Sequence, residues 1–298
     1  MKNVILFNLG VDLSRKMLYN YGMEKLIFDV ADIIGEMKIS DYLRKKLGFS
    51  TSLITKVKMG GVSISGTVVT MRATVKSGDI IEVILPEEES EGIKPIEIKL
   101  NIVYEDEHVL VVDKPTDMPT HPSRGNSLPT LANAVAAYMG KPFVFRSVNR
   151  LDRGTSGLVV IAKNSYSAAK LGRSMKNGEF LKKYTAHVEG VPEKQKDVIS
   201  APIRRECEGN IKRIVAPDGK EAITEYEVIE VLEDGTSLCL VTLHTGRTHQ
   251  IRVHFAHIGH PLVGDFLYGK EKDRGYFLRC SEISFPHPLT NKIVTFKI

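Results

Sequence analysis

Short apolar runs separated by tight turns constrain the fold of this chain more than any other feature of its sequence. Residues 223–231 and 237–243 flank an Asp234-Gly235 pair, which is typical of a β-hairpin. Residues 102–104 and 109–112 flank a second turn in the same way. Because strands outnumber helices and hairpins connect several of them, we predict an α+β fold. Its sheet is mixed and mostly antiparallel with flanking helices, not doubly wound.

Two helices and a further strand are predicted between the two hairpins. One helix extends from a Thr130 cap to Gly140, and a second covers residues 165–175 before Asn177-Gly178 ends it. The apolar residues 158–162 form a strand between them. Residues 96–298 are therefore predicted to form one larger domain.

A smaller α/β module precedes this domain. Ser40 is predicted to cap a short helix that extends to Lys46, and Ser50 or Thr51 a second one that extends to Lys58. Short strands with tight turns follow at residues 62–64, 67–69 and 80–85. The predicted parts are an N-terminal extension and first strand (1–38), the small module (39–87), an acidic linker (88–95) and the larger domain (96–298). Within the first part, residues 23–30 form the strand, and residues 1–22 are an extension or the product of an upstream start.

The positive charge of the chain is concentrated in the small module. The 298 residues carry 41 Lys and Arg against 36 Asp and Glu, a net charge of +5. Residues 38–85 alone hold eight Lys and Arg against three Asp and Glu, which accounts for the whole excess. This charge is compatible with a nucleic-acid partner without requiring one.

Composition excludes several classes of protein. The 26% of charged residues is typical of globular proteins and excludes disordered, collagen-like and disulfide-scaffold chains. No apolar run approaches the roughly 18 residues of a membrane helix, and residues 4–9 are too short for a signal peptide. The three Cys are widely spaced, which fits a reducing compartment, and we expect a cytoplasmic protein.

Residues 147–158 are the segment best suited to catalysis. Asp152 lies in a polar, glycine-flanked loop with Arg150 and Arg153 beside it, and this loop leads into the apolar strand. Nearby cations favour the ionised carboxylate that a nucleophile or a base requires. An isolated Asp before a glycine is more often a turn residue, so this loop alone does not assign a function.

A second polar segment, residues 243–265, contains Gln250, Arg252 and several His. Its alternation predicts an extended strand with Thr248, Gln250 and Arg252 on one side. The His spacing lacks Cys and any H-E-x-x-H pair, so packing or RNA contact is favoured over a zinc site. Tyr184, which follows two Lys, could stack on a base or be an ordinary strand tyrosine.

Taken in order, these segments resemble the RluA-type pseudouridine synthases. Residues 149–158, NRLDRGTSGL, are similar to the family motif H-R-L-D-x-x-T-S-G-L, and residues 246–265 match a later motif almost residue for residue. Further matches lie at residues 113–115, 183–190 and 284–288. Residues 39–85 separately resemble an S-four-like RNA-binding module, which is shared with a small-subunit ribosomal protein.

The resemblance implies isomerisation of uridine in RNA to its carbon-linked isomer, without a cofactor, nucleotide or metal. Asp152 matches the catalytic aspartate that breaks the glycosidic bond, whether it first adds to the base or first acts at the sugar. Tyr184 matches the residue that stacks on the target base, and Arg252 the residue that pairs with the aspartate. Arg150 matches the residue that fills the gap left by the flipped nucleotide.

Base flipping agrees with elementary energetics. Extruding a stacked base costs a few kcal/mol, and stacking on an aromatic ring returns about 1–3 kcal/mol. The module would position the RNA through phosphate contacts, for which we expect Arg44, Lys45, Lys56 and Lys58. Large-subunit ribosomal RNA is the expected substrate and transfer RNA the alternative, and we expect a monomer.

The sequence departs from the family pattern at two positions. Asn149 replaces the usual His of the first motif, which puts any acid–base role at that position in doubt. Asp117 stands where the motif around Lys114-Pro115 usually has a glycine, a change that concerns loop shape more than chemistry.

Two functions other than pseudouridine synthesis would require different residues. A non-catalytic RNA-binding or ribosome-assembly protein would be expected to lack Asp152 or Tyr184, and both are present. A glycosidase-like hydrolase would need a second carboxylic acid across the sugar, and neither main motif offers a clear Glu.

Overall fold

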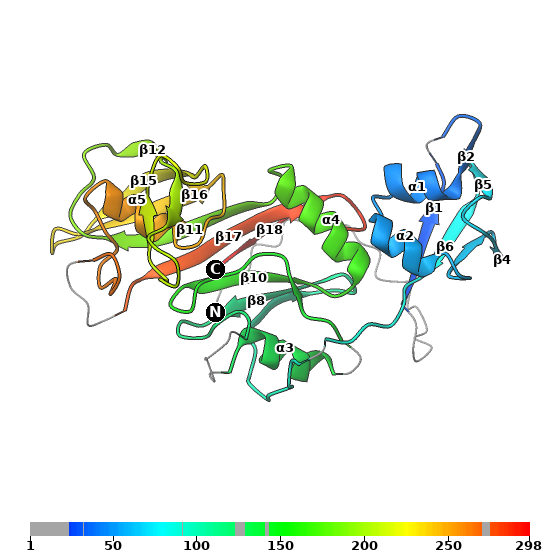
Figure 1. The fold of residues 1–298 in the computed structure, drawn as a ribbon, viewed down its shortest axis with the longest axis horizontal. Coiled ribbons are helices and arrows are strands. Elements are labelled where there is room, and N and C mark those ends of the chain that lie inside the picture. Colours follow the sequence, from blue (N-terminus) through cyan, green and yellow to red (C-terminus); the bar gives the residue numbers. More distant parts are fainter. Residues whose placement is uncertain (1–23, 32, 91, 123–128, 141–142, 270–274) are drawn as a thin grey trace.

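The computed structural model describes residues 24–31, 33–90, 92–122, 129–140, 143–269 and 275–298. The predicted extension at residues 1–22 lies outside this part of the chain. A small module stands at one end of an elongated larger part, whose central strands extend along the long axis of the molecule (Figure 1).

The small module combines an antiparallel sheet of order β1-β6-β3-β4, a two-stranded sheet of β2 and β5, and two short helices. The elements are β1 (Lys25–Asp29), β2 (Glu36–Lys38), α1 (Ile39–Lys45), α2 (Thr51–Val57), β3 (Val62–Ile64), β4 (Thr67–Val68), β5 (Thr74–Lys76) and β6 (Ile80–Ile84). The predicted first strand is confirmed as β1, which pairs with β6 along its whole length. Leu26 and Phe28 of β1 are buried with both helices in one apolar core.

The two helices of the module begin for different reasons. Ser50 caps α2, because its side chain accepts a hydrogen bond from the backbone N–H of Leu53 at 3.1 Å. The predicted Ser40 cap of α1 is wrong. Ile39, which is fully buried, already begins that helix, and its N–H donates to the carbonyl of Ala73 at 2.8 Å. Tertiary packing therefore sets the start of α1.

The larger part is built on a ten-stranded sheet with the order β12-β15-β16-β11-β17-β10-β8-β7, to which β9 and β18 add at β10 and β17. Its strands are β7 (Ile102–Glu105), β8 (Val109–Lys114), β9 (Arg146–Ser147), β10 (Ser156–Ala162), β11 (Leu181–Val188), β12 (Lys196–Ser200), β15 (Ile223–Val231), β16 (Ser237–Leu243), β17 (Leu278–Pro286) and β18 (Ile293–Lys297). A separate pair is formed by β13 (Ile203–Arg205) and β14 (Arg213–Val215). Only β10 and β17 pair in parallel among the described strands, so the predicted mixed, mostly antiparallel α+β fold is confirmed.

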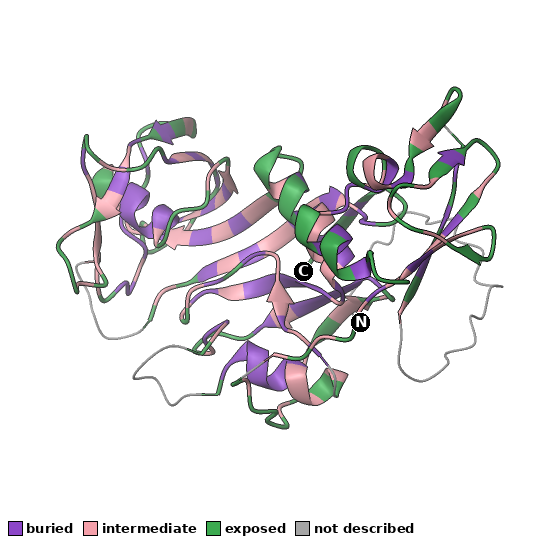
Figure 2. Cartoon of the chain, turned by 45° about the vertical axis from the view of Figure 1, so that its right-hand side comes forward, coloured by how far each residue is buried: buried purple, intermediate pink, exposed green. Residues whose placement is uncertain are grey.

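Helices cover this sheet, and its core follows the central strands (Figure 2). The helices are α3 (Leu131–Met139), α4 (Ser165–Lys176) and α5 (Gln250–His257). The first two confirm the predictions, with Thr130 and Asn164 at their N-caps. Helix α5 shows that one prediction is wrong, because residues 250–257 are helical where we expected an extended strand.

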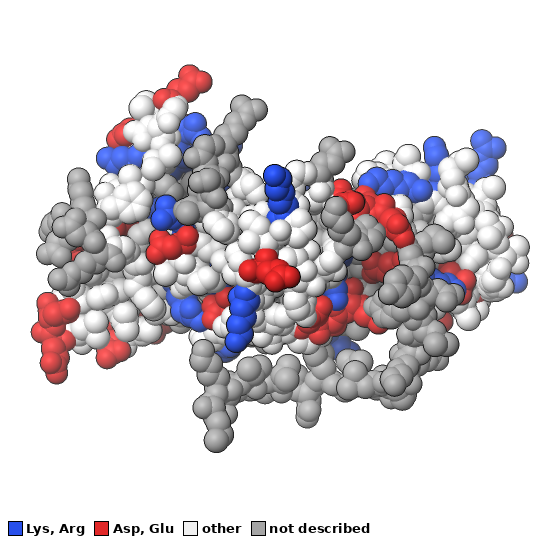
Figure 3. Space-filling model, turned by 90° about the horizontal axis from the view of Figure 1, so that it is seen from below, with Lys and Arg blue, Asp and Glu red and all other residues white. Residues whose placement is uncertain are grey.

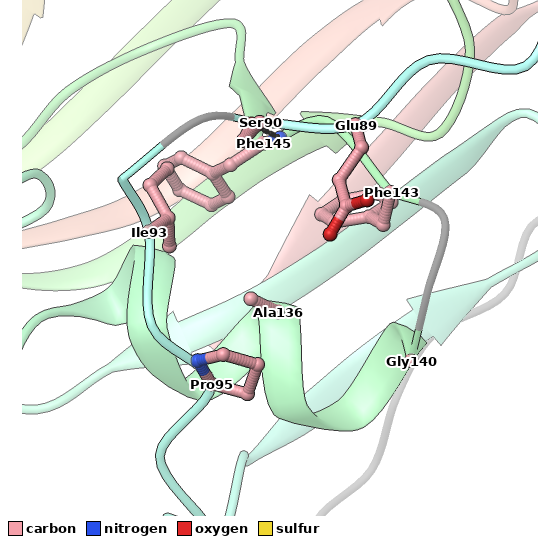
Figure 4. Close-up of a pocket in the computed structure, with 8 residues that line it drawn as sticks. All are labelled: Glu89, Ser90, Ile93, Pro95, Ala136, Gly140, Phe143 and Phe145. Carbon is pink, nitrogen blue, oxygen red and sulfur yellow. Dashed lines mark hydrogen bonds between the residues drawn. The ribbon is translucent and has the colours of Figure 1, made fainter.

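The linker region lies against the larger part. The N–H of Ser90 donates to the carbonyl of Phe143 at 3.0 Å, and the Ser90 hydroxyl accepts from the N–H of Phe145 at 3.0 Å. Between the linker and α3, Ile93 and Ala136 help to line a pocket of about 10 Å³, close to the volume needed for one water (Figure 4). Ser90 and Ile93 of the predicted linker are thus packed on the larger part that follows.

One tyrosine of α4 joins the module to the larger part. The Tyr166 ring packs against Phe28 and Phe49, with centroids 5.6 and 4.8 Å away, and its hydroxyl donates to the carbonyl of Leu47 at 3.2 Å. Nearby, the amide of Asn164 donates to Glu24. Burial raises the pKa of Glu24 to about 7. The two parts therefore share an apolar and hydrogen-bonded contact.

Candidate active site

Asp152 lies in the wall of a large cleft beside the central strands. The cleft has a volume of about 1270 Å³. Its lining includes Asp113, Asp152, His249, Arg252, Tyr276 and Arg279. The Asp152 side chain is 35% exposed, so its carboxylate is accessible to a molecule in the cleft.

Backbone contacts from a neighbouring loop hold Asp152 in position. The hydroxyl of Thr120 donates to the carbonyl of Leu151 at 2.8 Å and accepts from its N–H at 3.2 Å. The Lys114 ammonium, fully buried, donates to the carbonyl of Arg153 at 3.3 Å and to the carbonyl of Met118 at 2.7 Å. Burial lowers the pKa of Lys114 to about 8. The Asp-Lys-Pro segment, a weak signal in the sequence, thus anchors the loop of Asp152.

The glycine that follows this loop permits the parallel strand pair. Gly157 of β10 lies opposite Cys280 of β17, and its φ is +109°. A β carbon at this position would lie 2.3 Å from the carbonyl oxygen of Cys280. Only glycine lets the two backbones approach this closely, which explains the Thr-Ser-Gly of the motif.

Asn149, the departure from the family motif, has a structural role. Its amide donates to the carbonyl of Leu158 at 3.0 Å, and its oxygen accepts from the N–H of Val160 at 2.9 Å. The side chain is buried and both amide groups bond to β10. In this sequence the residue ties the Asp152 loop to the strand.

The second departure, Asp117, has a left-handed backbone. Its φ of +60° is a conformation that glycine adopts without strain. Its carboxylate lies 3.7 Å from Arg153, and both side chains are exposed. The departure therefore concerns loop shape, and Arg153 is paired with Asp117 at the cleft.

Arg252 reaches the cleft from the first turn of α5. Its guanidinium donates two hydrogen bonds of 2.6 Å to the carboxylate of Asp265, which is fully buried. Burial opposes the charge on Arg252, but its hydrogen bonds to Asp265 and the negative charges nearby outweigh burial and raise the pKa of the guanidinium. The ring centre of Tyr276 lies 4.4 Å from the guanidinium carbon.

Arg252 is paired with a different carboxylate from the one expected, although the charge of Asp152 also acts on it. Among the described residues its ion pair is with Asp265, and none joins it to Asp152, although both line the cleft. We did not single out Asp265 from the sequence. It lies in the second motif, but a lone Asp after glycine gives no sign that it pairs with a buried arginine.

Tyr184 of β11 is buried, with only 5% of the residue exposed, and it is not among the residues that line the cleft. Its hydroxyl hydrogen-bonds the Cys280 thiol, and burial is the main cause that raises the pKa of Tyr184 well above its usual value. The charge of Asp152 is close enough to add to this shift. Arg150, by contrast, is exposed and does not line the cleft.

Three histidines of the second motif, His249, His254 and His260, hydrogen-bond other groups of the protein. His254 is buried between the hydroxyl of Thr224 and the carbonyl of Ala201, at 2.8 and 2.9 Å. His260 contacts the carbonyl of Glu189 at 2.8 Å. His249 alone of the three faces Asp152, with Nε2 3.9 Å from its carboxylate.

The basic side chains predicted to bind RNA all lie on α1, α2 or the residue after α2, and all are exposed. Lys45 pairs with Asp41 at 3.5 Å, and Lys56 pairs with Glu88 of the linker. Arg44 and Lys58 have no ion pair with another described residue. In the view from below, Lys and Arg side chains stand out on the module, and acidic side chains gather beside it (Figure 3).

Comparisons with known proteins agree with this architecture. The family model for RNA pseudouridylate synthase matches residues 108–257. An uncharacterized RNA pseudouridine synthase of Bacillus subtilis is 38% identical over 268 residues, which cover 87% of this chain and 94% of the relative. The ribosomal large subunit pseudouridine synthase D of Pasteurella multocida is 39% identical, over 77% of this chain and 69% of the relative.

A solved structure gives the same result. Human RNA pseudouridylate synthase domain containing 1 superposes with a TM-score of 0.57 at 28% identity, over 70% of this chain and 85% of the human chain. The chain therefore belongs to the RNA pseudouridylate synthase family, and it is an isomerase that acts on RNA. Within the described residues, no helix has the length and apolar character of a membrane span.

Proposed function

We propose that this pseudouridine synthase isomerises uridine in large-subunit ribosomal RNA, with Asp152 as the catalytic residue and a flipped base as its substrate. The observation that carries the proposal is the position of Asp152, whose half-exposed carboxylate shares one cleft with Arg252. The cleft, of about 1270 Å³, is large enough for an extruded nucleotide and its neighbours.

The chemistry requires one bond to break and another to form at the same sugar carbon. The bond from the sugar to nitrogen 1 of uracil breaks, the base rotates, and a new bond forms to carbon 5. The hydrogen on carbon 5 leaves to solvent, and nitrogen 1 gains one, so no oxidant or reductant is needed. Asp152 serves this sequence as a carboxylate that can act on the base or on the sugar.

The three other predicted site residues are assigned roles that fit their surroundings. Arg252 is a fixed cation in the wall of the cleft, so it can stabilise negative charge on the detached base without being reoriented. Its pairing with Asp152 would then be formed in the RNA complex. Tyr184, which is buried and lies within electrostatic range of Asp152, would support the base by its ring edge or face. Arg150, which is exposed, would fill the gap in the RNA helix.

The small module is proposed to be the S-four-like unit that positions the RNA. Residues 39–87 carry its helices, and β1 packs in the same core. Because Lys45 and Lys56 already have carboxylate partners, Arg44 and Lys58 should contribute more to phosphate binding. Linker residues 88–95 and the catalytic domain, residues 96–298, complete the proposed division.

The name of the Pasteurella relative supports large-subunit ribosomal RNA as the substrate. The test is tritium release from uridine labelled at carbon 5, measured on large-subunit, small-subunit and transfer RNA transcripts in parallel. Release from the large-subunit transcript alone is expected. Release from transfer RNA alone would overturn the substrate assignment, and free uracil as the product would overturn the isomerase chemistry in favour of hydrolysis.

A further inference from the structure

We propose that His249 is a positioning residue for Asp152, held by Tyr268 with its Nε2–H directed at the carboxylate. The inference rests on the proposed role of Asp152. Nε2 of His249 lies 3.9 Å from Oδ2 of Asp152, and both side chains line the cleft. This separation exceeds a direct hydrogen bond, but it suits one bridging water or closure when RNA binds.

The hydrogen bonds of Tyr268 determine which nitrogen of His249 carries the proton. The Tyr268 hydroxyl oxygen accepts from the backbone N–H of Arg213 at 2.9 Å. Its own proton is then free to be donated to Nδ1 of His249, which lies 2.9 Å away. With Nδ1 as the acceptor, the neutral ring holds its proton on Nε2, the nitrogen that faces Asp152.

The charges around His249 keep the ring neutral. Burial is the main cause that lowers its pKa, and the guanidinium groups of Arg252 and Arg213 add to the effect. The carboxylates of Asp152 and Asp265 oppose it. Near neutral pH the ring therefore donates to Asp152 as an uncharged group, which orients the carboxylate without protonating it.

The backbone of His249 is an independent sign of a role beyond packing. Its φ is +59° and its ψ 18°, at the N-cap of α5, yet its side chain makes no capping hydrogen bond. A left-handed residue other than glycine costs about 1–2 kcal/mol. Glycine or asparagine would fit this backbone better, so the position holds a strained residue whose ring faces the cleft instead of the helix.

Arg252 does not supply this positioning in the free enzyme. Its guanidinium is bonded to Asp265, whereas Nε2 of His249 lies 3.9 Å from the carboxylate of Asp152. His249 would thus set the carboxylate before RNA arrives, and Arg252 would stabilise charge once the base is bound.

The test compares His249→Gly with wild type in single-turnover tritium release at saturating RNA, over pH 5.5 to 9. Glycine adopts the left-handed backbone without strain, so the variant should fold. We expect the rate constant to fall about tenfold to a hundredfold, with the RNA dissociation constant changed less than twofold. Added imidazole should restore part of the rate, and an acid limb below the usual pKa of His should disappear.

His244→Asn is the matched control. His244 is an exposed histidine of the same segment that contacts Glu225 at 3.1 Å, and its variant should match wild type. Three results for His249→Gly would overturn the inference: an unchanged rate, weaker RNA binding at an unchanged rate, or a slow variant that keeps the acid limb and ignores imidazole. If wild type itself releases no tritium from any RNA, the proposed function fails instead.

Discussion

The substitution Gly157→Ala tests how the two central strands hold the loop that carries Asp152. Gly157 lies five positions after Asp152 and pairs with Cys280 across the parallel contact of β10 and β17. An added β carbon would lie 2.3 Å from the carbonyl oxygen and 2.6 Å from the amide nitrogen of Cys280. Both atoms belong to the backbone, so no side-chain rotation relieves the clash.

The expected loss of stability follows from two contributions. Ordinary carbon–oxygen contacts are about 3.3 Å or longer, so the strands must separate by roughly 1 Å, and overpacking of this kind costs about 1–3 kcal/mol. The φ of +109° adds about 1–2 kcal/mol for an alanine. A total of about 2–5 kcal/mol is a large share of the roughly 5–15 kcal/mol that stabilises a typical protein. Turnover should fall as well, because Asp152 and Tyr184 lie on the two sides of this contact.

Gly172→Ala is the matched control for the same chemical change. Gly172 is exposed in α4 and has no atom within 4 Å of an added β carbon. Alanine should raise the free energy of unfolding there by about 0.5–1 kcal/mol. Urea unfolding and tritium release on both variants provide the test. Loss of stability in neither variant, or equal loss in both, would refute the close-approach argument.

Three further substitutions probe the site and the domain contact. Asp265→Asn leaves the Arg252 guanidinium buried without its carboxylate, so we expect a loss of about 3–5 kcal/mol in urea unfolding and slower turnover. Asp117→Gly should raise the melting temperature slightly, because glycine removes the strain of a positive φ. The Glu24→Gln substitution should change how the free energy of unfolding depends on pH. Burial raises the wild-type pKa from 4.5 to about 7, so the folded state retains a proton that the unfolded state has lost. Wild type should therefore lose up to about 3 kcal/mol relative to the variant as the pH rises from 4.5 through 7, measured by urea unfolding at pH 5 and pH 8.

Each of these variants has its own control or contrary result. Asp218→Asn removes an exposed pair with Arg204 and should change stability by less than about 0.5 kcal/mol, in contrast to Asp265→Asn. A lower melting temperature for Asp117→Gly would show that its contact with Arg153 matters more than its backbone. If the free energies of unfolding of wild type and Glu24→Gln change with pH in parallel, the Glu24 carboxylate is not desolvated at the domain contact.

Local signals were enough to predict much of the fold. The Asp234-Gly235 hairpin and the caps at Thr130 and Ser50 are set by neighbouring residues, and the structure has them as expected. The start of α1 was missed because the burial of Ile39 and its bond to Ala73, the residue before β5, depend on a segment far along the chain.

Two of the predicted site residues, Asp152 and Arg252, line the same cleft, but the ion pair that Arg252 forms was not predictable. Helix α5 buries Gln250, Arg252 and His254, which the sequence presents as polar residues typical of a surface. Their partners come from distant segments, such as Asp265 for Arg252 and Thr224 for His254. These contacts satisfy the buried polar groups and so allow a polar helix to be buried. The local sequence does not show the contacts, and its alternating polarity therefore indicated an extended strand.

The central claim is that Asp152 performs the chemistry, and Asp152→Asn tests it most directly. The amide keeps the size of the side chain but removes its charge, and the exposed position should leave stability within about 0.5 kcal/mol of wild type. At saturating large-subunit RNA, we expect single-turnover tritium release to fall by at least about 10²–10⁴-fold, with RNA binding retained. Release within a few-fold of wild type would contradict the assignment and place the catalytic group elsewhere in the cleft.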